Sequence, residues 1–192
     1  LNEHVTGAKW PPVDVRREML EEAVAVIRLL WRGNVQSHRG AHYTVEAARL
    51  YTLPPKPPPI VVAASGGKAA RLAGQIGDGF VTTDPDPALL RTFRRAGGRG
   101  KPSFVEVTVC WAKSERDARR TAHEIWALAA LEGALFTEIA QPAHFEAAFK
   151  PISEEQVARV VVCGPDPARH LAAIRRASHA GYDHVCVHQI GS

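Results

Sequence analysis

The stretch IVVAASGGKAARLAGQIGDGFVTT, residues 60–83, decides the fold class of this chain. A short apolar run at 60–63 leads into Ser65-Gly66-Gly67, and the residues from 68 to about 75 have the periodicity of a helix. A second apolar run at 79–83 predicts the next strand. Short apolar strands that alternate with helices predict βα units and a parallel sheet.

The same alternation extends over most of the chain. Helices are expected at 13–31, from a cap at 84–87 to about 95, from an N-cap at Ser114 to about 131 and from a cap at Asp166 to about 180. A helical turn opens at 153–155. Strands are expected at 104–111, in a buried run at 160–163 and at 184–188, with short strands around a turn at 33–51. Residues 132–151 show no clear period and are expected to be irregular or to carry short helices.

Two α/β architectures are compatible with this pattern. Four or five βα units complete an open doubly wound sheet, whereas they make only about half of a (β/α)₈ barrel, which needs about 250 residues. The residue pattern alone therefore favours the open sheet. Residues 52–59, TLPPKPPP, contain five prolines and are interpreted as a Pro-rich connector within the domain; a ligand for an SH3-type partner is the alternative.

Composition narrows the class of protein. The 192 residues carry 24 Lys and Arg against 20 Asp and Glu, and no apolar run approaches the roughly 20 residues of a membrane span. Neither a signal peptide nor a CxxC spacing is visible, and all three cysteines are expected to be reduced and buried in strands, which favours a cytoplasmic protein. The basic cluster at 91–101 lacks interleaved stacking aromatics, so we expect no nucleic-acid partner.

The turn after the first of these strands is a candidate phosphate site. Backbone N–H groups at the start of a helix lack internal partners and carry partial positive charge. Gly66 and Gly67 let a phosphate approach the backbone, Ser65 offers a hydroxyl donor, and Lys68 adds a charge. The pattern matches neither G-x-G-x-x-G nor G-x-x-x-x-G-K-[ST]. The alternative is a plain helix cap with a tight turn.

The residues alone predict neither a catalytic group nor a metal site. His38 and His42 flank a turn at Gly40, so the spacing of two ligands on one helix does not apply to them. His184 and His188 share one face of the last strand, and no carboxylate is spaced to complete a metal set. Functional groups cluster at the C-terminal ends of barrel strands, so His188 is a candidate pocket residue. The paired carboxylates 21–22 and 154–155 are interpreted as solvated.

Several motifs taken together resemble one family. They are LNEHVTG at 1–7, REMLEEAVAVIRLLWRG at 17–33, HRGAHYTV at 38–45, VVAASGGKAARLAGQIGDGFVTT at 61–83, FVEVTVCWA at 104–112, WALAALEGAL at 126–135, PAHFEAAF at 142–149, VVCGPDPARH at 161–170 and AGYDHVCVHQIG at 180–191. In this order they are similar to the luciferase-like (β/α)₈ oxidoreductases, in the branch of the coenzyme F420-dependent glucose-6-phosphate dehydrogenases.

This resemblance implies a TIM barrel rather than an open sheet. The chain would be the C-terminal part of one luciferase-like barrel domain, 1–192, with about four βα units plus an insertion, beginning after the fourth strand. The family's active-site histidine, tryptophan and glutamate would lie upstream, so no catalytic residue is expected here. The resemblance assigns cofactor contacts to Asn2, Ala63, Ala64, Ser65, Gly66, Gly67, Lys68 and Ala69.

The positions that bind the substrate match the family less well than those that bind the cofactor. Thr83 matches a threonine that contacts sugar phosphate in the glucose-6-phosphate enzymes, but Asp86 stands where they carry a lysine. Their phosphate-contacting arginine falls at or near Val160, with Arg159 beside it. A carboxylate repels phosphate, so a different alcohol or an uncharged carbonyl compound is expected as substrate.

The resemblance implies an F420-dependent oxidoreductase that transfers hydride between a small alcohol or carbonyl substrate and the deazaflavin, inactive as this part alone. The alternatives are an FMN-dependent luciferase-like monooxygenase and a non-catalytic half-barrel that binds a phosphate-bearing ligand. A half-barrel leaves strand edges unpaired, and such edges template association. We therefore expect a homodimer or association with the missing N-terminal half.

Overall fold

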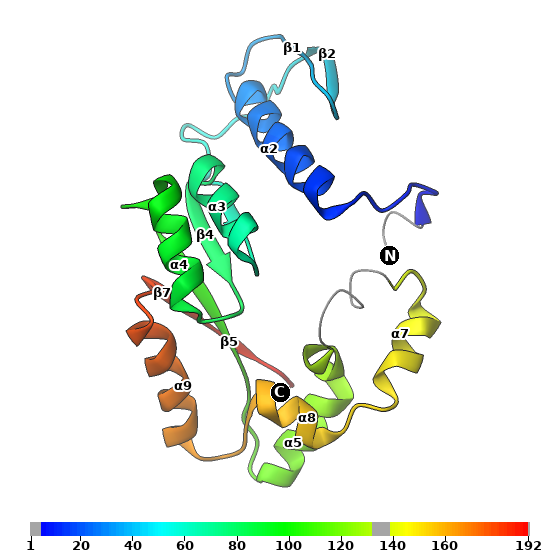
Figure 1. Ribbon diagram of the computed structural model, residues 1–192, viewed down its shortest axis with the longest axis vertical. Helices are drawn as coiled ribbons and strands as arrows, with labels where there is room; N and C mark the ends of the chain where they lie inside the picture. The colour runs from blue at the N-terminus through cyan, green and yellow to red at the C-terminus, as the bar shows by residue number, and fades with distance from the viewer. Residues whose placement is uncertain (1–4, 132–138, 192) are drawn as a thin grey trace. The chain divides into compact units, whose positions relative to one another are not determined.

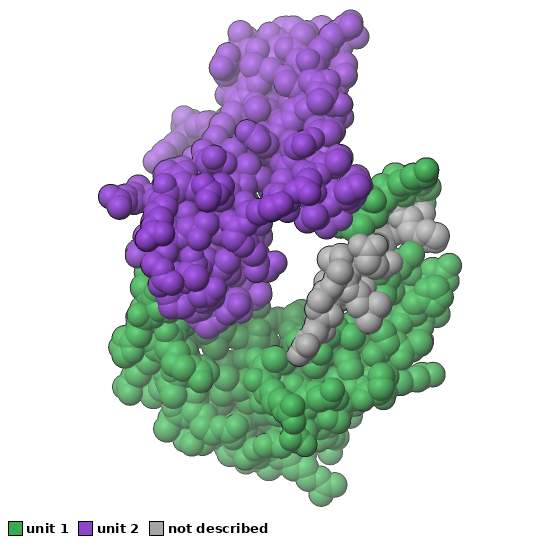
Figure 2. Space-filling view, viewed as in Figure 1, with its two compact units in different colours: residues 1–10, 105–192 green, residues 11–104 purple. Residues whose placement is uncertain are grey.

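The computed structural model describes residues 5–131 and 139–191. The chain divides into two compact units, of which unit 2 is Pro11–Phe104 and unit 1 combines Leu1–Trp10 with Val105–Ser192 (Figure 2). Whether the two units form one barrel domain stays a prediction of the sequence. Among the described residues, no helix combines the length and apolar character needed to cross a membrane.

Unit 2 begins with a long helix and a hairpin and continues as strand–helix units (Figure 1). Its elements are α2 (Val13–Leu30), β1 (Gln36–Arg39), β2 (Thr44–Ala48), β3 (Val61–Ala63), α3 (Gly67–Ile76), β4 (Gly79–Thr82), α4 (Pro87–Phe93) and a π-helical turn at Arg94–Gly98. Strands β3 and β4 are parallel, with Val62 opposite Phe80. The predicted alternation is thus confirmed, and residues 52–59 contain neither helix nor strand.

The core of unit 2 lies under α3 and α4, which pack against each other (Figure 1). Phe80 of β4 and Phe93 of α4 are fully buried and stack at 5.1 Å between ring centroids. Gly74 of α3 is needed for close approach, because a Cβ there would lie 2.5 Å from the carbonyl oxygen of Phe93. The Lys101 ammonium donates to the Gly74 carbonyl oxygen at 2.7 Å, which holds the segment after the π-helical turn to α3.

The β1–β2 hairpin is tied to α2 through Glu22. One carboxylate oxygen contacts His38 at 3.0 Å and accepts from the Tyr43 N–H at 2.9 Å, and the other accepts from the His42 N–H at 3.0 Å. Desolvation raises the pKa of Glu22, but these hydrogen bonds outweigh it and bring the pKa to about 2. The expectation that Glu22 is simply solvated was therefore wrong.

Unit 1 is built on the last strands of the chain. Its elements are β5 (Ser103–Cys110, of which the first two residues belong to unit 2), α5 (Glu115–Trp126), a 3₁₀ turn at Ala127–Ala130, α7 (Pro142–Phe149), α8 (Glu154–Val160), β6 (Val162–Cys163), α9 (Pro167–His179) and β7 (His184–Gln189). Strand β6 runs parallel to β5, with Cys110 opposite Cys163. Strand β7 also pairs with β5, and the Ile190 N–H donates to the Val109 carbonyl oxygen at 2.8 Å.

The core of unit 1 lies where α5 and α8 meet the ends of β5 and β6. Ala118 and Ala122 of α5 are fully buried, and their small side chains let this helix pack closely on Cys110. Val157 of α8 and Ile190 complete the same cluster. The predicted N-cap at Ser114 is confirmed, because its hydroxyl accepts from the Asp117 N–H at 3.1 Å.

Two sequence expectations about buried residues were wrong. Val160 was placed in a buried strand, but it is the last residue of α8 and is 53% exposed; only Val161 and Cys163 of that run are buried. A short apolar run does not distinguish a strand from the end of a helix. Cys110 and Cys163 are buried as expected, whereas Cys186 of β7 is exposed.

Candidate functional site

A pocket opens at the C-terminal ends of β3 and β4 in unit 2. Its volume is about 240 Å³, and the residues that line it are Ala63, Ala64, Ser65, Val81, Thr82 and Thr83. The Ala64 N–H donates to the Val81 carbonyl oxygen at 3.0 Å, so the two strand ends are held together beneath the pocket. The structure thus brings three of the predicted cofactor residues next to the predicted substrate residue Thr83.

The start of α3 lies directly after this pocket in the chain and is not capped by the protein itself. Gly66 is the N-cap residue and Gly67 the first helical residue; no side chain caps the helix, and its first turn contains no acidic residue. A Cβ added at Gly66 or Gly67 would meet nothing within 4 Å. Packing within the chain therefore does not require glycine here, and the open space suits a group that approaches the backbone N–H donors.

The polar side chains near this helix start differ in how freely they can reach a ligand. Among the described residues, the Ser65 hydroxyl has no hydrogen-bond partner, and Ser65 is exposed. The Lys68 ammonium lies 3.4 Å from the Asp14 carboxylate of α2, and its side chain is 79% exposed. The guanidinium of Arg17 and the Lys68 ammonium together lower the pKa of Asp14. The Lys68 side chain thus forms an ion pair with Asp14 of α2, and it does not line the pocket.

The N-terminus of the neighbouring helix, α4, is capped by the side chain of its N-cap residue, Asp86. The Asp86 carboxylate accepts a hydrogen bond from the Ala88 N–H at 2.7 Å, and Pro87 stands at the first helical position. The Asp84 N–H donates to the Thr82 hydroxyl at 3.1 Å, which shapes the loop that carries Thr83. Asp86 therefore has a structural function as a helix cap, besides the negative charge that the family resemblance brought to attention.

The remaining predicted site residues lie elsewhere. Gly66, Gly67, Lys68 and Ala69 form the start of α3 but do not line the pocket. Asn2 lies outside the described residues. His188 is on β7 in unit 1, where it contacts side chains of β5 and α5.

His188 belongs to a polar cluster that the sequence did not predict. Its Nδ1 lies 3.4 Å from the Glu106 carboxylate of β5, and its ring meets Trp126 of α5 edge to face at 4.9 Å between centroids. The Thr108 hydroxyl lies 3.4 Å from the same Glu106 oxygen. The signal in the sequence was the polar residues at even positions among the valines of β5, but nothing local paired them with β7.

A second pocket in unit 1 contains the positions compared with the family's phosphate-contacting arginine. It measures about 330 Å³ and is lined by parts of α8 and α9, including Arg159, Val160, Arg169 and Arg176. Arg159 pairs with Glu155 at 3.0 Å, and Arg169 lies 3.4 Å from Glu115. Two of its three guanidinium groups are thus already opposed by carboxylates.

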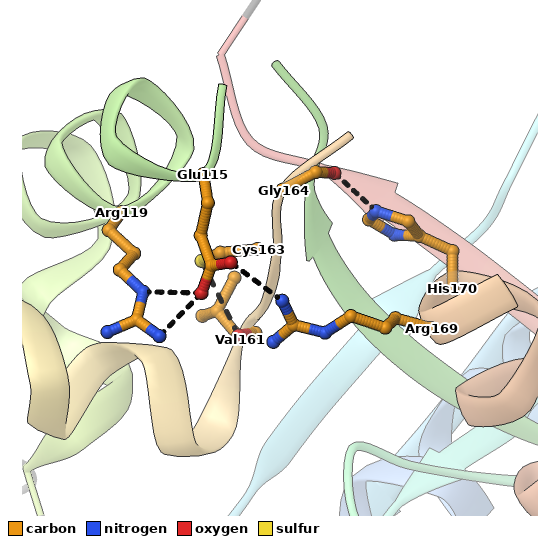
Figure 3. Close-up of polar contacts among 7 residues, drawn as sticks. All are labelled: Glu115, Arg119, Val161, Cys163, Gly164, Arg169 and His170. Atoms are coloured by element: carbon orange, nitrogen blue, oxygen red, sulfur yellow. Dashed lines mark hydrogen bonds and ion pairs between the residues drawn. The ribbon is translucent and has the colours of Figure 1, made fainter. Parts of the chain in front are cut away.

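The contacts beside this pocket join α5 to α9. Figure 3 shows the Glu115 carboxylate between Arg119, at 2.6 Å, and Arg169. Hydrogen bonds from Arg119 and the charges of both arginines lower the pKa of Glu115. The His170 ring lies 2.8 Å from the Gly164 carbonyl oxygen, so α9 contacts the turn that follows β6.

The buried thiols of unit 1 are poor nucleophiles. Burial, with a smaller contribution from Cys110, raises the pKa of the Cys163 thiol to about 11, and burial also raises that of Cys110. In the part of the chain that the structure describes, no group of three or more His, Cys, Asp or Glu side chains could hold a metal ion.

Comparison with known sequences adds to this geometry. The family model described as luciferase-like monooxygenase matches residues 2–184. The chain is 30% identical over 203 residues to an F420-dependent glucose-6-phosphate dehydrogenase of Microbacterium testaceum, and 30% identical to one of Nakamurella multipartita. Each alignment covers 100% of this chain and 60% of the relative, so the chain spans three fifths of the length of these relatives.

Solved structures show the same fold. An F420-dependent secondary alcohol dehydrogenase in complex with an F420–acetone adduct matches with a TM-score of 0.83 and 26% identity, over 97% of this chain and 60% of that one. An F420-dependent tetrahydromethanopterin reductase from Methanopyrus kandleri matches with a TM-score of 0.62 at 15% identity, over 88% of this chain and 56% of that one. The residue pattern alone favoured an open sheet; that preference was wrong, and the chain has the fold of part of a luciferase-like (β/α)₈ barrel.

Proposed function

Because the chain belongs to the luciferase-like monooxygenase family, we propose that it is the cofactor-phosphate part of a coenzyme F420-dependent oxidoreductase. One observation supports this most strongly: the uncapped start of α3 opens beside the pocket at the ends of β3 and β4. An anionic phosphate is the ligand that such a helix start favours, because unpartnered N–H donors and the helix dipole act together there.

The residues present fit that cofactor. The open space at Gly66 and Gly67 admits a phosphate, the Ser65 hydroxyl is available as a donor, and Ala63 and Ala64 let a flat ring system approach the strand ends. When bound, the deazaflavin of F420 exchanges a hydride with a substrate carbon. The contribution of this chain is to hold the phosphate, fix the cofactor's position and keep water from it.

We propose a small alcohol or carbonyl compound as the substrate, with Thr83 as its contact at the rim of the pocket. Support comes from the relatives, one of which is described as a secondary alcohol dehydrogenase. Glucose 6-phosphate is disfavoured, because Asp86 adds negative charge three residues from Thr83 and two of the three arginines that line the unit 1 pocket are paired with carboxylates. Catalytic side chains are proposed outside this chain.

FMN is the alternative cofactor, since its phosphate would suit the same helix start. The names of the more similar relatives favour F420. Titration of the protein with F420 and with FMN, followed by fluorescence anisotropy, separates the two. We expect saturable binding of F420 and at least tenfold weaker binding of FMN. The reverse preference would refute the proposal.

We also propose that the β3 edge is covered in the working protein. Among the described residues β3 pairs only with β4, and Val61 and Ala63 on it are exposed. A second copy of the chain, or the N-terminal half of a family barrel, would satisfy that edge. Sedimentation of the purified chain tests this, because a stable monomer at high concentration would contradict the proposal.

A further inference from the structure

Strand β5 has one apolar and one polar face. Val105, Val107 and Val109 are at most 9% exposed, whereas Glu106 between them is 36% exposed. Because side chains alternate along a strand, Glu106 and Thr108 share the face opposite the valines. His188 of β7 approaches Glu106 from this polar face.

The imidazole ring of His188 is held in place by packing, but one of its nitrogens lacks a hydrogen-bond partner. Its Nδ1 is inaccessible to solvent and makes no hydrogen bond, although the Glu106 carboxylate lies 3.4 Å away. Trp126 packs edge to face against the ring and limits its rotation. A buried polar atom without a partner costs free energy, so a small closing movement that joins Nδ1 to Glu106 is favoured.

The position of Glu106 determines which ring nitrogen carries the proton. A carboxylate accepts only from a protonated nitrogen, so it favours the tautomer with hydrogen on Nδ1. In that tautomer Nε2 presents a lone pair and acts as a hydrogen-bond acceptor. Among the described residues Nε2 has no partner, and the side chain is 36% exposed.

The charge around this nitrogen selects among ligands. Strands β5 and β7 carry no lysine or arginine, and the Glu106 carboxylate lies 3.4 Å from His188 Nδ1. A phosphate would be repelled there, whereas a neutral hydroxyl could donate to Nε2 beside the apolar edge of Trp126. We propose that His188, oriented by Glu106, accepts a hydrogen bond from the hydroxyl group of a small uncharged alcohol. The identification of this alcohol as the substrate rests on the proposed F420-dependent function.

The first test is independent of any cofactor. Long-range ¹H–¹⁵N correlation spectra of the ¹⁵N-labelled chain at pH 9, above the usual titration range of histidine, report the tautomer. The signals of His188 are identified by their loss in His188→Gln. We expect the Nδ1–H form to predominate in the wild type and in the control Glu124→Gln, and to lose its predominance in Glu106→Gln. A predominant Nε2–H form in the wild type would overturn the proposal.

The second test concerns the ligand. Titration of the F420-loaded protein with 2-propanol, followed by the indole N–H signal of Trp126, which packs against the ring of residue 188, gives a dissociation constant for wild type and variant alike. We expect binding about tenfold weaker in His188→Phe, whose ring keeps the packing but cannot accept the hydrogen bond, with F420 affinity unchanged. Competition with inorganic phosphate should have no effect at this site. Equal alcohol binding by wild type and variant overturns the proposal, whereas failure of the wild type to bind F420 refutes only the proposed cofactor.

Discussion

The helices α3 and α4 both follow a parallel strand in unit 2, yet their first turns differ. The start of α4 is closed by Asp86, whose carboxylate accepts from the Ala88 N–H. The start of α3 has Gly66 in the same place, with no side-chain cap and no acidic residue in its first turn. The difference teaches that the start of α3, unlike that of α4, has backbone donors without a side-chain cap and an open approach, which are the conditions for binding an anion.

The largest expected effect comes from making α3 resemble α4. Gly66 has extended backbone angles that any residue adopts, and its Cβ position is open. Gly66→Asp should cap α3 and raise the thermal midpoint, because Asp is a preferred N-cap. The same carboxylate should weaken F420 binding at least about 100-fold, or about 2.7 kcal/mol, as measured by fluorescence titration.

The uncharged variant separates the two causes of that loss. Gly66→Asn caps the helix without adding a charge, so we expect it to weaken F420 about tenfold, between the wild type and Gly66→Asp. If Gly66→Asp is stabilised but binds F420 as tightly as the wild type, the helix start does not hold the phosphate.

The reverse change at α4 should affect stability rather than binding. Asp86→Ala removes the cap, and we expect the free energy of unfolding to fall by about 1 kcal/mol. Asp86→Asn keeps an acceptor oxygen and should retain most of that stability. Denaturant unfolding of both variants checks this, and an unchanged midpoint in Asp86→Ala would show that the cap contributes nothing.

Smaller effects are expected from the side chains beside α3. Ser65→Ala should weaken F420 about threefold to tenfold, the range for loss of one hydrogen bond. Lys68→Ala should weaken it less than threefold, because Lys68 is highly exposed and lies near Asp14. A larger loss in Lys68→Ala than in Ser65→Ala would show that charge, not the backbone and hydroxyl donors, holds the phosphate.

The smallest and most local effect concerns the hairpin, where a carboxylate again satisfies backbone donors. The pKa of Glu22 is about 2 in the folded chain, below its ordinary value of 4.5. A lowered pKa means that Glu22 stabilises the hairpin fully above pH 4.5, and that this contribution is lost as the pH falls toward 2. The amide signal of Tyr43, followed by NMR, should therefore titrate near pH 2. A midpoint near 4.5 would contradict the bonding seen here.

Local patterns were sufficient to predict much of the fold. The strand–helix alternation from residue 60 onward, the N-caps Ser114 and Asp166 and the antiparallel hairpin all depend on neighbouring residues, and the structure confirms them. Val160 and Cys186 were misplaced, because burial depends on which segments pack nearby. The residue pattern also favoured an open sheet, since a part of a barrel has the same local signals as a smaller complete sheet.

The two candidate sites differ in how far apart their residues lie in the sequence. The α3 site is built from consecutive residues, so the run from Ala63 to Lys68 was visible in the sequence. The partners of His188 come from β5 and α5, far away in the chain. The even spacing on β7 indicated His188 as a pocket residue, and this stays a prediction. The contact with Glu106 depends on the pairing of β7 with β5, which no local pattern specifies.

The central claim is that this chain holds the cofactor by its phosphate at the start of α3. The most direct measurement compares the affinity of the protein for F420 with its affinity for the same deazaflavin ribityl alcohol lacking the phosphate. We predict that F420 binds at least about 100-fold more tightly, and that Gly66→Asp abolishes this difference. Equal affinity of the wild-type protein for both compounds would contradict the account.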